Sequence, residues 1–215
     1  MKLYYHPISS YSQKAVMAFH EKGATFKPML INIMDPQAKA EYRKVHPLAK
    51  LPLLVDEKAD RVVPESSIII EYIDRHCPGG TKLIPDDPDL ARQVRFKDRM
   101  MDLYVNDSMG KIFFDGMRPE GKRDPHGVAQ AKATLDSVFE LVDRDMATKT
   151  WAMGDTFSMA DCAAAPALAY CRMVHPFDKH KNLSAYAARL MERPSFMKIH
   201  DEAKPFLAAF SANKA

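Results

Sequence analysis

Hydroxyl side chains gather where a short strand near the amino terminus meets the first predicted helix. Ser9, Ser10, Tyr11 and Ser12 follow one another directly before or within the first turn of that helix. Backbone N–H groups and the positive end of the helix dipole favour an anion at such a position. A serine hydroxyl there can donate a hydrogen bond to the thiolate of another molecule, whereas a cysteine there would itself become the thiolate.

One hydrogen bond can supply most of the free energy needed to stabilise a thiolate at neutral pH. A free thiol has a pKa of about 8.5, and lowering it by two units takes about 2.7 kcal/mol. A charge-assisted hydrogen bond contributes about 1.5–3 kcal/mol and a helix terminus about 0.3–1 kcal/mol. Serine is also among the best helix N-caps, so a purely structural explanation of these residues stays open.

The segments that position these hydroxyls follow from the periodicity of the first part of the chain. Alternating strand and helix patterns occur in the order strand, helix, strand, helix, strand, strand, helix. The predicted strands are residues 2–5, 26–33, 51–55 and 61–63, and the predicted helices are residues 10–22, 37–45 and 65–75. This order predicts a small α/β module of the thioredoxin type.

The rest of the chain has a helical pattern throughout. Helices are predicted at residues 90–117, 125–147, 158–174, 183–192 and 196–204. Proline and glycine interrupt the sequence at residues 77–80 and again at 85–88. We therefore predict a thioredoxin-like domain at residues 1–78, a linker at 79–88 and an all-helical domain at 89–215.

Composition argues against several classes of protein. The 215 residues carry a net charge of +3, with 31 basic and 28 acidic residues interleaved, so nucleic-acid binding is disfavoured. The apolar runs are shorter than the ~20 residues of a spanning helix, and the amino terminus does not resemble a signal peptide. We expect a cytoplasmic protein with no membrane segment. The three cysteines and eight histidines lack metal-ligand spacing, so no metal site is predicted.

Four segments carry a resemblance to known proteins. Residues 9–15, Ser-Ser-Tyr-Ser-Gln-Lys-Ala, resemble the Cys-Pro-Tyr-Cys-x-Lys-Ala motif of glutaredoxins with both cysteines replaced by serine. Residues 46–54, 64–73 and 154–161 resemble segments of the cytosolic glutathione S-transferase family in the same order. His46 and Ala49 depart from that family's Asn-Pro-x-Gly-Lys-Val-Pro pattern. The chain resembles a bacterial-like member of this family with a serine motif.

The resemblance implies which group activates the thiol of glutathione. Ser9 occupies the place of the first glutaredoxin cysteine and is the preferred residue. Some transferase classes use a tyrosine at the end of the first strand, so Tyr5 is a second candidate. Ser10 and Ser12 are candidates as well, and Ser12 is also explained as a residue that caps or packs.

The resemblance also implies how the rest of glutathione is held. The residue before a cis proline, here Leu51 before Pro52, would exchange backbone hydrogen bonds with the cysteinyl part. Glu65 and Ser66 would bind the γ-glutamyl end at a helix N-terminus. Donors for the glycine carboxylate would come from Gln37, Lys39 and Lys50. By contrast, Ser158 and Asp161 have the spacing of a capping box and are assigned to folding.

The second substrate would be a small apolar electrophile. Tyr11, Tyr104 and Ser108 are the candidates for contacting it, although a stripe of methionine and aromatic residues on a helix is more often core. The implied reaction is conjugation of the glutathione thiolate to carbon, as in detoxification, by a homodimer. Glutathione-dependent isomerase, dehalogenase, etherase or peroxidase activity would begin with the same thiolate. A non-catalytic glutathione-binding or regulatory role on the same fold is the other alternative, and the Glu65–Ser66 pair and Ser9 argue against it.

Overall fold

The computed structural model describes the backbone of residues 1–212, which divides into two compact units. Unit 1 joins Met1–Leu83 to the C-terminal segment that begins at Pro194, and unit 2 is Ile84–Arg193. The predicted fold class, a thioredoxin-like α/β domain followed by a helical domain, is confirmed. The sequence-based division gives all of residues 89–215 to the second domain, whereas the C-terminal segment clusters with unit 1.

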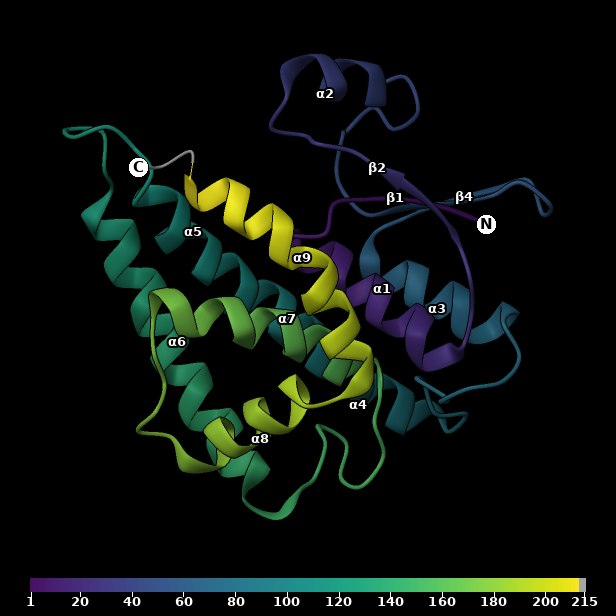
Figure 1. The fold of residues 1–215 in the computed structure, drawn as a ribbon. Coiled ribbons are helices and arrows are strands. Elements are labelled where there is room, and N and C mark those ends of the chain that lie inside the picture. Colours follow the sequence, from purple (N-terminus) through teal and green to yellow (C-terminus); the bar gives the residue numbers. More distant parts are fainter. Residues whose placement is uncertain (213–215) are drawn as a thin grey trace. The chain divides into compact units, whose positions relative to one another are not determined.

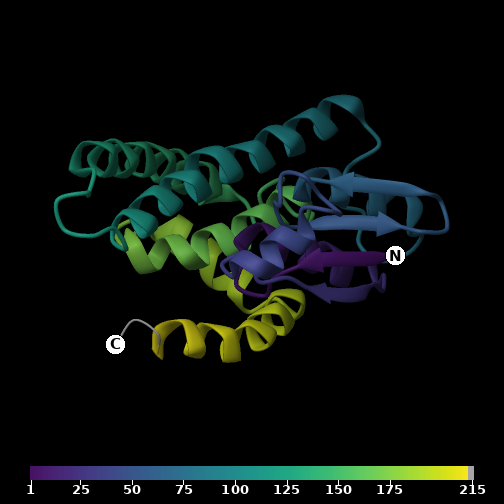
Figure 2. The ribbon, with the colours of Figure 1, turned by 90° about the horizontal axis from the view of Figure 1, so that it is seen from above.

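The sheet of unit 1 has four strands in the order β2-β1-β3-β4 (Figure 2). These strands are β1 (Lys2–Tyr5), β2 (Lys27–Leu30), β3 (Leu53–Asp56) and β4 (Arg61–Pro64). Strand β2 runs parallel to β1, while β3 is antiparallel to both β1 and β4. Each strand lies within two or three residues of its predicted position, and β2 is shorter than predicted.

Helices cover both faces of this sheet (Figure 1). Helices α1 (Ser10–Lys22) and α3 (Ser66–His76) lie on one face, and α2 (Pro36–Tyr42) lies on the other. The alternation of side chains along β1 matches this arrangement. Leu3 and Tyr5 are buried, while the ring of Tyr4 stacks on Tyr42 at the end of α2 with centroids 5.6 Å apart.

Two polar links join α1 to α3 inside unit 1. The Lys14 ammonium donates to the Ser67 hydroxyl at 2.8 Å, and Lys22 pairs with Asp74 at 3.1 Å. Both lysine side chains are buried. Removing one member of the buried Lys22–Asp74 ion pair costs far more than an exposed pair contributes, and the hydrogen bond from Lys14 to Ser67 adds a second buried link between α1 and α3.

The last helix, α9 (Pro194–Ala212), packs beside α1 in unit 1 (Figure 1). The prediction that it ends at residue 204 is wrong. Pro205 follows that point, and a proline lacks the N–H of a helix interior, yet the helix continues through it. The buried side chains of Phe196, Ile199 and Ala203 supply the apolar stripe that holds α9 in place.

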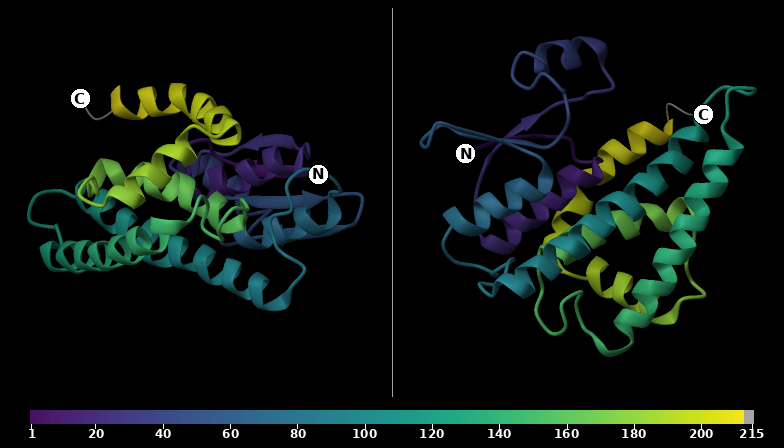
Figure 3. Two further views of the ribbon diagram at one scale, coloured as in Figure 1. Left: turned by 90° about the horizontal axis from the view of Figure 1, so that it is seen from below. Right: turned by 180° about the vertical axis from the view of Figure 1, so that it is seen from behind.

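Unit 2 is helical (Figure 3). Its helices are α4 (Pro88–Met100), the π-helical turn η1 (Met101–Asn106), α5 (Asp107–Asp115), α6 (Pro125–Asp145), the 3₁₀ turn η2 (Met146–Thr148), α7 (Met159–Val174) and α8 (Lys181–Met191). The sequence predicts α4 to α5 as one uninterrupted helix and gives no sign of the π turn. Within residues 1–212, no helix is long and apolar enough to span a membrane.

The predicted capping box begins α7. The Asp161 carboxylate accepts from the backbone N–H and hydroxyl of Ser158 at 2.9 and 3.1 Å. It also accepts from the Ala152 N–H at 2.8 Å and from the Tyr186 hydroxyl at 2.7 Å. Asp161 is fully buried, and desolvation raises its pKa against the opposing effect of these donors. The assignment of Ser158 and Asp161 to folding is therefore confirmed.

Replacing Asp161 with alanine tests how much unit 2 depends on this carboxylate. Asp161→Ala leaves several buried donors without an acceptor, and each costs about 1–3 kcal/mol. We expect the free energy of unfolding to fall by about 3–5 kcal/mol in a denaturant titration followed by the fluorescence of Trp151. Trp151, the only tryptophan of the chain, lies in unit 2. The exposed Asp155→Ala should change stability by less than about 0.5 kcal/mol, and an equal loss in both variants would contradict this account.

Candidate functional site

Ser9 is the N-cap of α1. Its hydroxyl accepts a hydrogen bond from the Ser12 backbone N–H at 3.3 Å, and its own N–H donates to the His6 carbonyl at 2.9 Å. The side chain is partly exposed. A hydroxyl that accepts through one lone pair keeps its proton to donate elsewhere. Ser9 can therefore cap the helix and stabilise an anion at the same time.

The structure distinguishes Ser9 from two of the three rival hydroxyls. Tyr5 is 4% exposed, and its hydroxyl donates to the Glu202 carboxylate of α9. Burial, together with that hydrogen bond, raises the pKa of Tyr5 well above its usual value. Ser12 is fully buried and its hydroxyl oxygen accepts from the His6 N–H at 3.3 Å. Ser10, the first residue of α1, is partly exposed like Ser9, as is Tyr11.

The second predicted segment leads into β3. The peptide bond between Leu51 and Pro52 is cis, as the resemblance implies, and both residues are buried. The Tyr42 hydroxyl donates to the Lys50 carbonyl at 2.9 Å and fixes the chain before the cis bond. The Lys50 side chain itself is exposed. On α2, Gln37 is exposed and Lys39 is partly buried.

The third predicted segment joins β4 to α3. Glu65 has φ 69° and ψ 127°, a conformation that side-chain-bearing residues rarely adopt, and its side chain is exposed. Ser66 follows as the first residue of α3 and is 3% exposed. Strained backbone of this kind costs about 1–3 kcal/mol and is found at functional sites. The Glu65 carboxyl and the first N–H groups of α3 together form a candidate site for a group that carries both charges.

The strand register brings the three segments to one edge of the sheet. Tyr4 of β1 lies opposite Leu53 of β3, and Leu53 lies opposite Pro64 of β4. The turn before Ser9 follows β1, the cis peptide precedes β3 and Glu65 follows β4. Because β3 is antiparallel to both neighbours, these three positions lie at the same end of adjacent strands.

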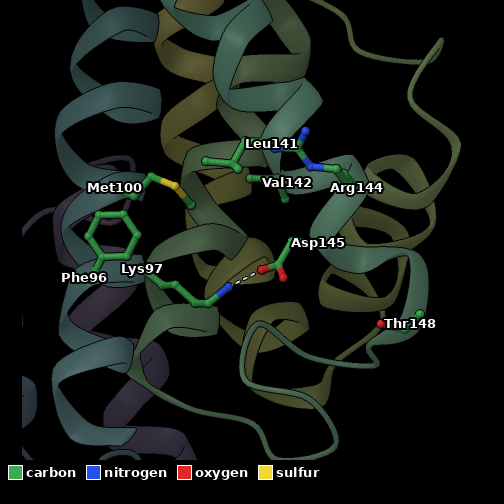
Figure 4. A pocket seen from close by; sticks show the side chains of 8 residues that line it. All are labelled: Phe96, Lys97, Met100, Leu141, Val142, Arg144, Asp145 and Thr148. Atoms are coloured by element: carbon green, nitrogen blue, oxygen red, sulfur yellow. Dashed lines mark hydrogen bonds and ion pairs between the residues drawn. The ribbon is translucent and has the colours of Figure 1, made fainter. Parts of the chain in front are cut away.

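Unit 2 holds two of the three candidate electrophile residues, Tyr104 and Ser108, and a cavity that neither of them lines. Tyr104 is 47% exposed, while Ser108 is buried. The cavity, of about 370 Å³, lies between α4 and α6 (Figure 4). Its lining combines apolar side chains with an ion pair: Phe96, Lys97, Met100, Leu141, Val142, Arg144, Asp145 and Thr148. Lys97 of α4 reaches across it to Asp145 of α6.

Sequence reasoning missed Glu202. Its partner Tyr5 lies 197 residues earlier in the chain, and no local pattern connects a strand residue with an acidic residue on the last helix. It missed the cavity as well, because Phe96 and Leu141 occupy ordinary positions of amphipathic helices. Only the folded chain shows these features.

Two family models match the sequence. The model described as "Glutathione S-transferase, N-terminal domain" matches residues 8–76, and the model described as "Glutathione S-transferase, C-terminal domain" matches residues 125–189. Together they span more than half of the chain, and the first includes all three segments of the candidate site.

Curated relatives and solved structures agree with this match. "Glutathione S-transferase hmp2" of Hypomyces subiculosus is 29% identical, over 95% of this chain and 99% of the relative. A "Stringent starvation protein A homolog" of Haemophilus ducreyi is 30% identical, over 91% of this chain and 87% of the relative. The crystal structure of a Methylobacillus flagellatus glutathione S-transferase with glutathione bound has a TM-score of 0.82 and 27% identity, over 92% of this chain and 98% of that one.

The strained backbone at Glu65 gives a stability prediction. Glycine adopts φ 69° without a Cβ penalty, so Glu65→Gly should raise the free energy of unfolding by about 0.5–1 kcal/mol. Glu65→Ala removes the same carboxyl group but keeps the strain, so it serves as the control and should not be stabilised. Denaturant titration of both variants measures the difference. If Glu65→Ala stabilises the protein as much as Glu65→Gly does, the loss of the carboxyl group, and not the relief of backbone strain, causes the change in unfolding free energy.

Proposed function

Since the chain belongs to the glutathione S-transferase family, we propose that it binds glutathione at the sheet edge described above and conjugates it to small apolar electrophiles. In this proposal residues 1–78 are the glutathione-binding domain, residues 79–88 the linker and residues 89–215 the helical domain. The observation that carries the proposal is the register that gathers the turn before Ser9, the Leu51–Pro52 peptide and Glu65 at one edge. The relative whose crystal structure holds glutathione supports the choice of ligand.

The proposed mechanism centres on the sulfur of glutathione. Ser9 donates its hydroxyl hydrogen to the thiolate, and the first N–H groups of α1 add a favourable field. These interactions stabilise the anion and so lower the pKa of the thiol. The thiolate attacks an electrophilic carbon, a C–S bond forms, and the displaced electron pair leaves with a leaving group or takes up a proton.

The ends of glutathione are held by the other two segments. The Glu65 carboxylate pairs with the γ-glutamyl ammonium, and Ser66 with the N-terminus of α3 accepts the carboxylate beside it. The backbone of Leu51, before Pro52, exchanges hydrogen bonds with the cysteinyl residue. Gln37, Lys39 and Lys50 are the proposed donors to the glycine carboxylate. The roles of Tyr11, Tyr104 and Ser108 toward the electrophile stay predictions.

A second candidate function is glutathione binding without transfer. One relative is named as a stringent starvation protein homologue rather than as a transferase, although its identity to this chain is similar. Retention on immobilised glutathione, followed by a spectrophotometric assay with a generic aromatic electrophile, separates the two. Turnover supports transferase activity. Retention without conjugation, isomerisation, dehalogenation, ether cleavage or peroxide reduction favours the binding protein.

Removing the Ser9 hydroxyl tests its role. Without the donor, the pKa of the bound thiol should rise by about 1–2 units, because a charge-assisted hydrogen bond contributes about 1.5–3 kcal/mol. The readout is the ultraviolet absorbance of the thiolate in the glutathione complex as a function of pH. Ser9→Ala also removes the N-cap, so Ser9→Gly, which caps almost as well, shows whether the shift survives without that loss. Ser10→Ala is the matched control, and a larger shift in Ser10→Ala would transfer the role to Ser10.

We also propose that the protein is a homodimer in which the first domain of one copy packs on the second domain of the other. The α4–α6 cavity and its apolar rim are the surface of the second domain that a second copy would cover. Phe96 and Leu141 on that rim are 58% and 41% exposed.

A charge on this rim should dissociate the dimer. Phe96→Glu should shift sedimentation from dimer toward monomer, because a buried unpaired carboxylate disfavours association. Met173→Glu, at a position 72% exposed near the end of α7, is the control and should leave the sedimentation unchanged. A wild-type protein that sediments as a monomer at micromolar concentration, or a dimer that tolerates Phe96→Glu, contradicts the assignment.

A further inference from the structure

The turn that delivers Ser9 to its place depends on His6. The His6 N–H donates to the buried Ser12 hydroxyl at 3.3 Å, and its carbonyl accepts from the Ser9 N–H at 2.9 Å. Its Nδ1 accepts from the Ile8 N–H at 3.4 Å. A ring nitrogen that accepts is unprotonated, and burial lowers the pKa of His6 in the same direction. Backbone and ring of His6 thus set the path of residues 6–9.

Helix α9 contacts this turn from the opposite end of the sequence, within unit 1 (Figure 1). Glu202 accepts from the Tyr5 hydroxyl, and Phe206, one helical turn later, packs edge-on against the His6 ring with centroids 5.2 Å apart. The two residues are four positions apart, so they project from the same face of α9. They contact two consecutive residues: Tyr5, the last residue of β1, and His6, the first residue of the turn.

We propose that Glu202 and Phe206 are positioning residues, which act through Tyr5 and His6 to hold the Ser9 hydroxyl where it meets the thiolate. This inference rests on the proposed function of Ser9. Tyr5 does not serve as a second thiol donor, because its buried hydroxyl is committed to a carboxylate. A misplaced donor loses much of its effect, since catalytic hydrogen bonds depend on sub-ångström positioning.

Other charged groups surround this contact. His20 of α1 lies within the electrostatic reach of Lys198 and Glu202 on α9 and of Glu21 on its own helix. Burial lowers the pKa of His20, with Lys198 acting in the same direction and the two glutamates against it. Glu21 accepts from the Ser195 hydroxyl at the start of α9. A substitution at Glu202 leaves His20, Lys198 and Glu21 unchanged.

The test compares Glu202→Ala with Glu202→Gln in the full-length protein. The glutamine oxygen can still accept from Tyr5, whereas alanine cannot. We expect Glu202→Ala to raise the pKa of the bound thiol by about 0.5–1 unit and to lower kcat at neutral pH about three- to tenfold. The KM for glutathione should stay within about twofold, and Glu202→Gln should restore kcat. Lys204→Ala, which removes an exposed side chain on the same helix, is the control.

Tyr5→Phe completes a double-mutant cycle. If Glu202 acts through the Tyr5 hydroxyl, Tyr5→Phe should match Glu202→Ala, and the double variant should be no worse than either one. Phe206→Ala should likewise raise the pKa of the bound thiol and lower kcat. If Glu202→Ala leaves the thiol pKa unchanged, the proposal is overturned. A lowered pKa overturns it as well, since a released Tyr5 would then be acting as a thiol donor.

Amide exchange separates this inference from the proposed function. A wild-type protein that fails to bind glutathione defeats the proposed function. In that case the exchange rates of the Ile8, Ser9 and Ser12 amides still test whether Glu202 holds the turn in place. Faster exchange of these amides in Glu202→Ala, restored in Glu202→Gln, supports positioning. Unchanged exchange rates overturn it, and so does a uniform rise throughout unit 1, which would indicate general destabilisation.

Discussion

The antiparallel pairing of β3 with both β1 and β4 is the constraint on which the candidate site depends. Tyr4, Leu53 and Pro64 stand side by side across the three strands. The chain leaves β1 and β4 at the same edge at which it enters β3, so three segments that are far apart in sequence converge there. Leu53 and Leu54 point to opposite faces of the sheet and both are fully buried, so packed side chains hold β3 from both sides.

Packing leaves only the first turn of α1 available for the proposed chemistry. The residues of α1 from Ser12 to Phe19 are all buried, and α3 and α9 both pack against it. The buried ammonium groups of Lys14 and Lys22 both have polar partners on α3, Ser67 for Lys14 and Asp74 for Lys22. What remains accessible is the first turn, where the partly exposed hydroxyls of Ser9, Ser10 and Tyr11 lie at the positive end of the helix dipole. The packing that stabilises the helix thus also determines which of its serines can meet a ligand.

The sequence predicts local features well and long-range contacts poorly. The capping serine at residue 9 and the capping box at residues 158–161 were predictable, because each depends on residues three apart. The hydrogen bond from Tyr5 to Glu202 was not, because it joins residues that meet only after α9 has packed on α1. The same limit explains the last helix. A local pattern with proline predicts the end of a helix, whereas tertiary packing extends α9 through Pro205.

The backbone at Glu65 is the clearest case of strain at a candidate functional residue. A residue with a side chain at φ 69° is costly, and glycine would adopt this conformation without that cost. The Glu65 side chain makes no capping hydrogen bond to α3, so helix stability does not explain a glutamate here. Ala49, at φ 49°, differs in this respect, because its methyl group is buried in the cluster with Tyr42, Leu51 and Leu53. An exposed carboxyl held in strained backbone beside a helix N-terminus supports the proposed role of Glu65 in holding a ligand.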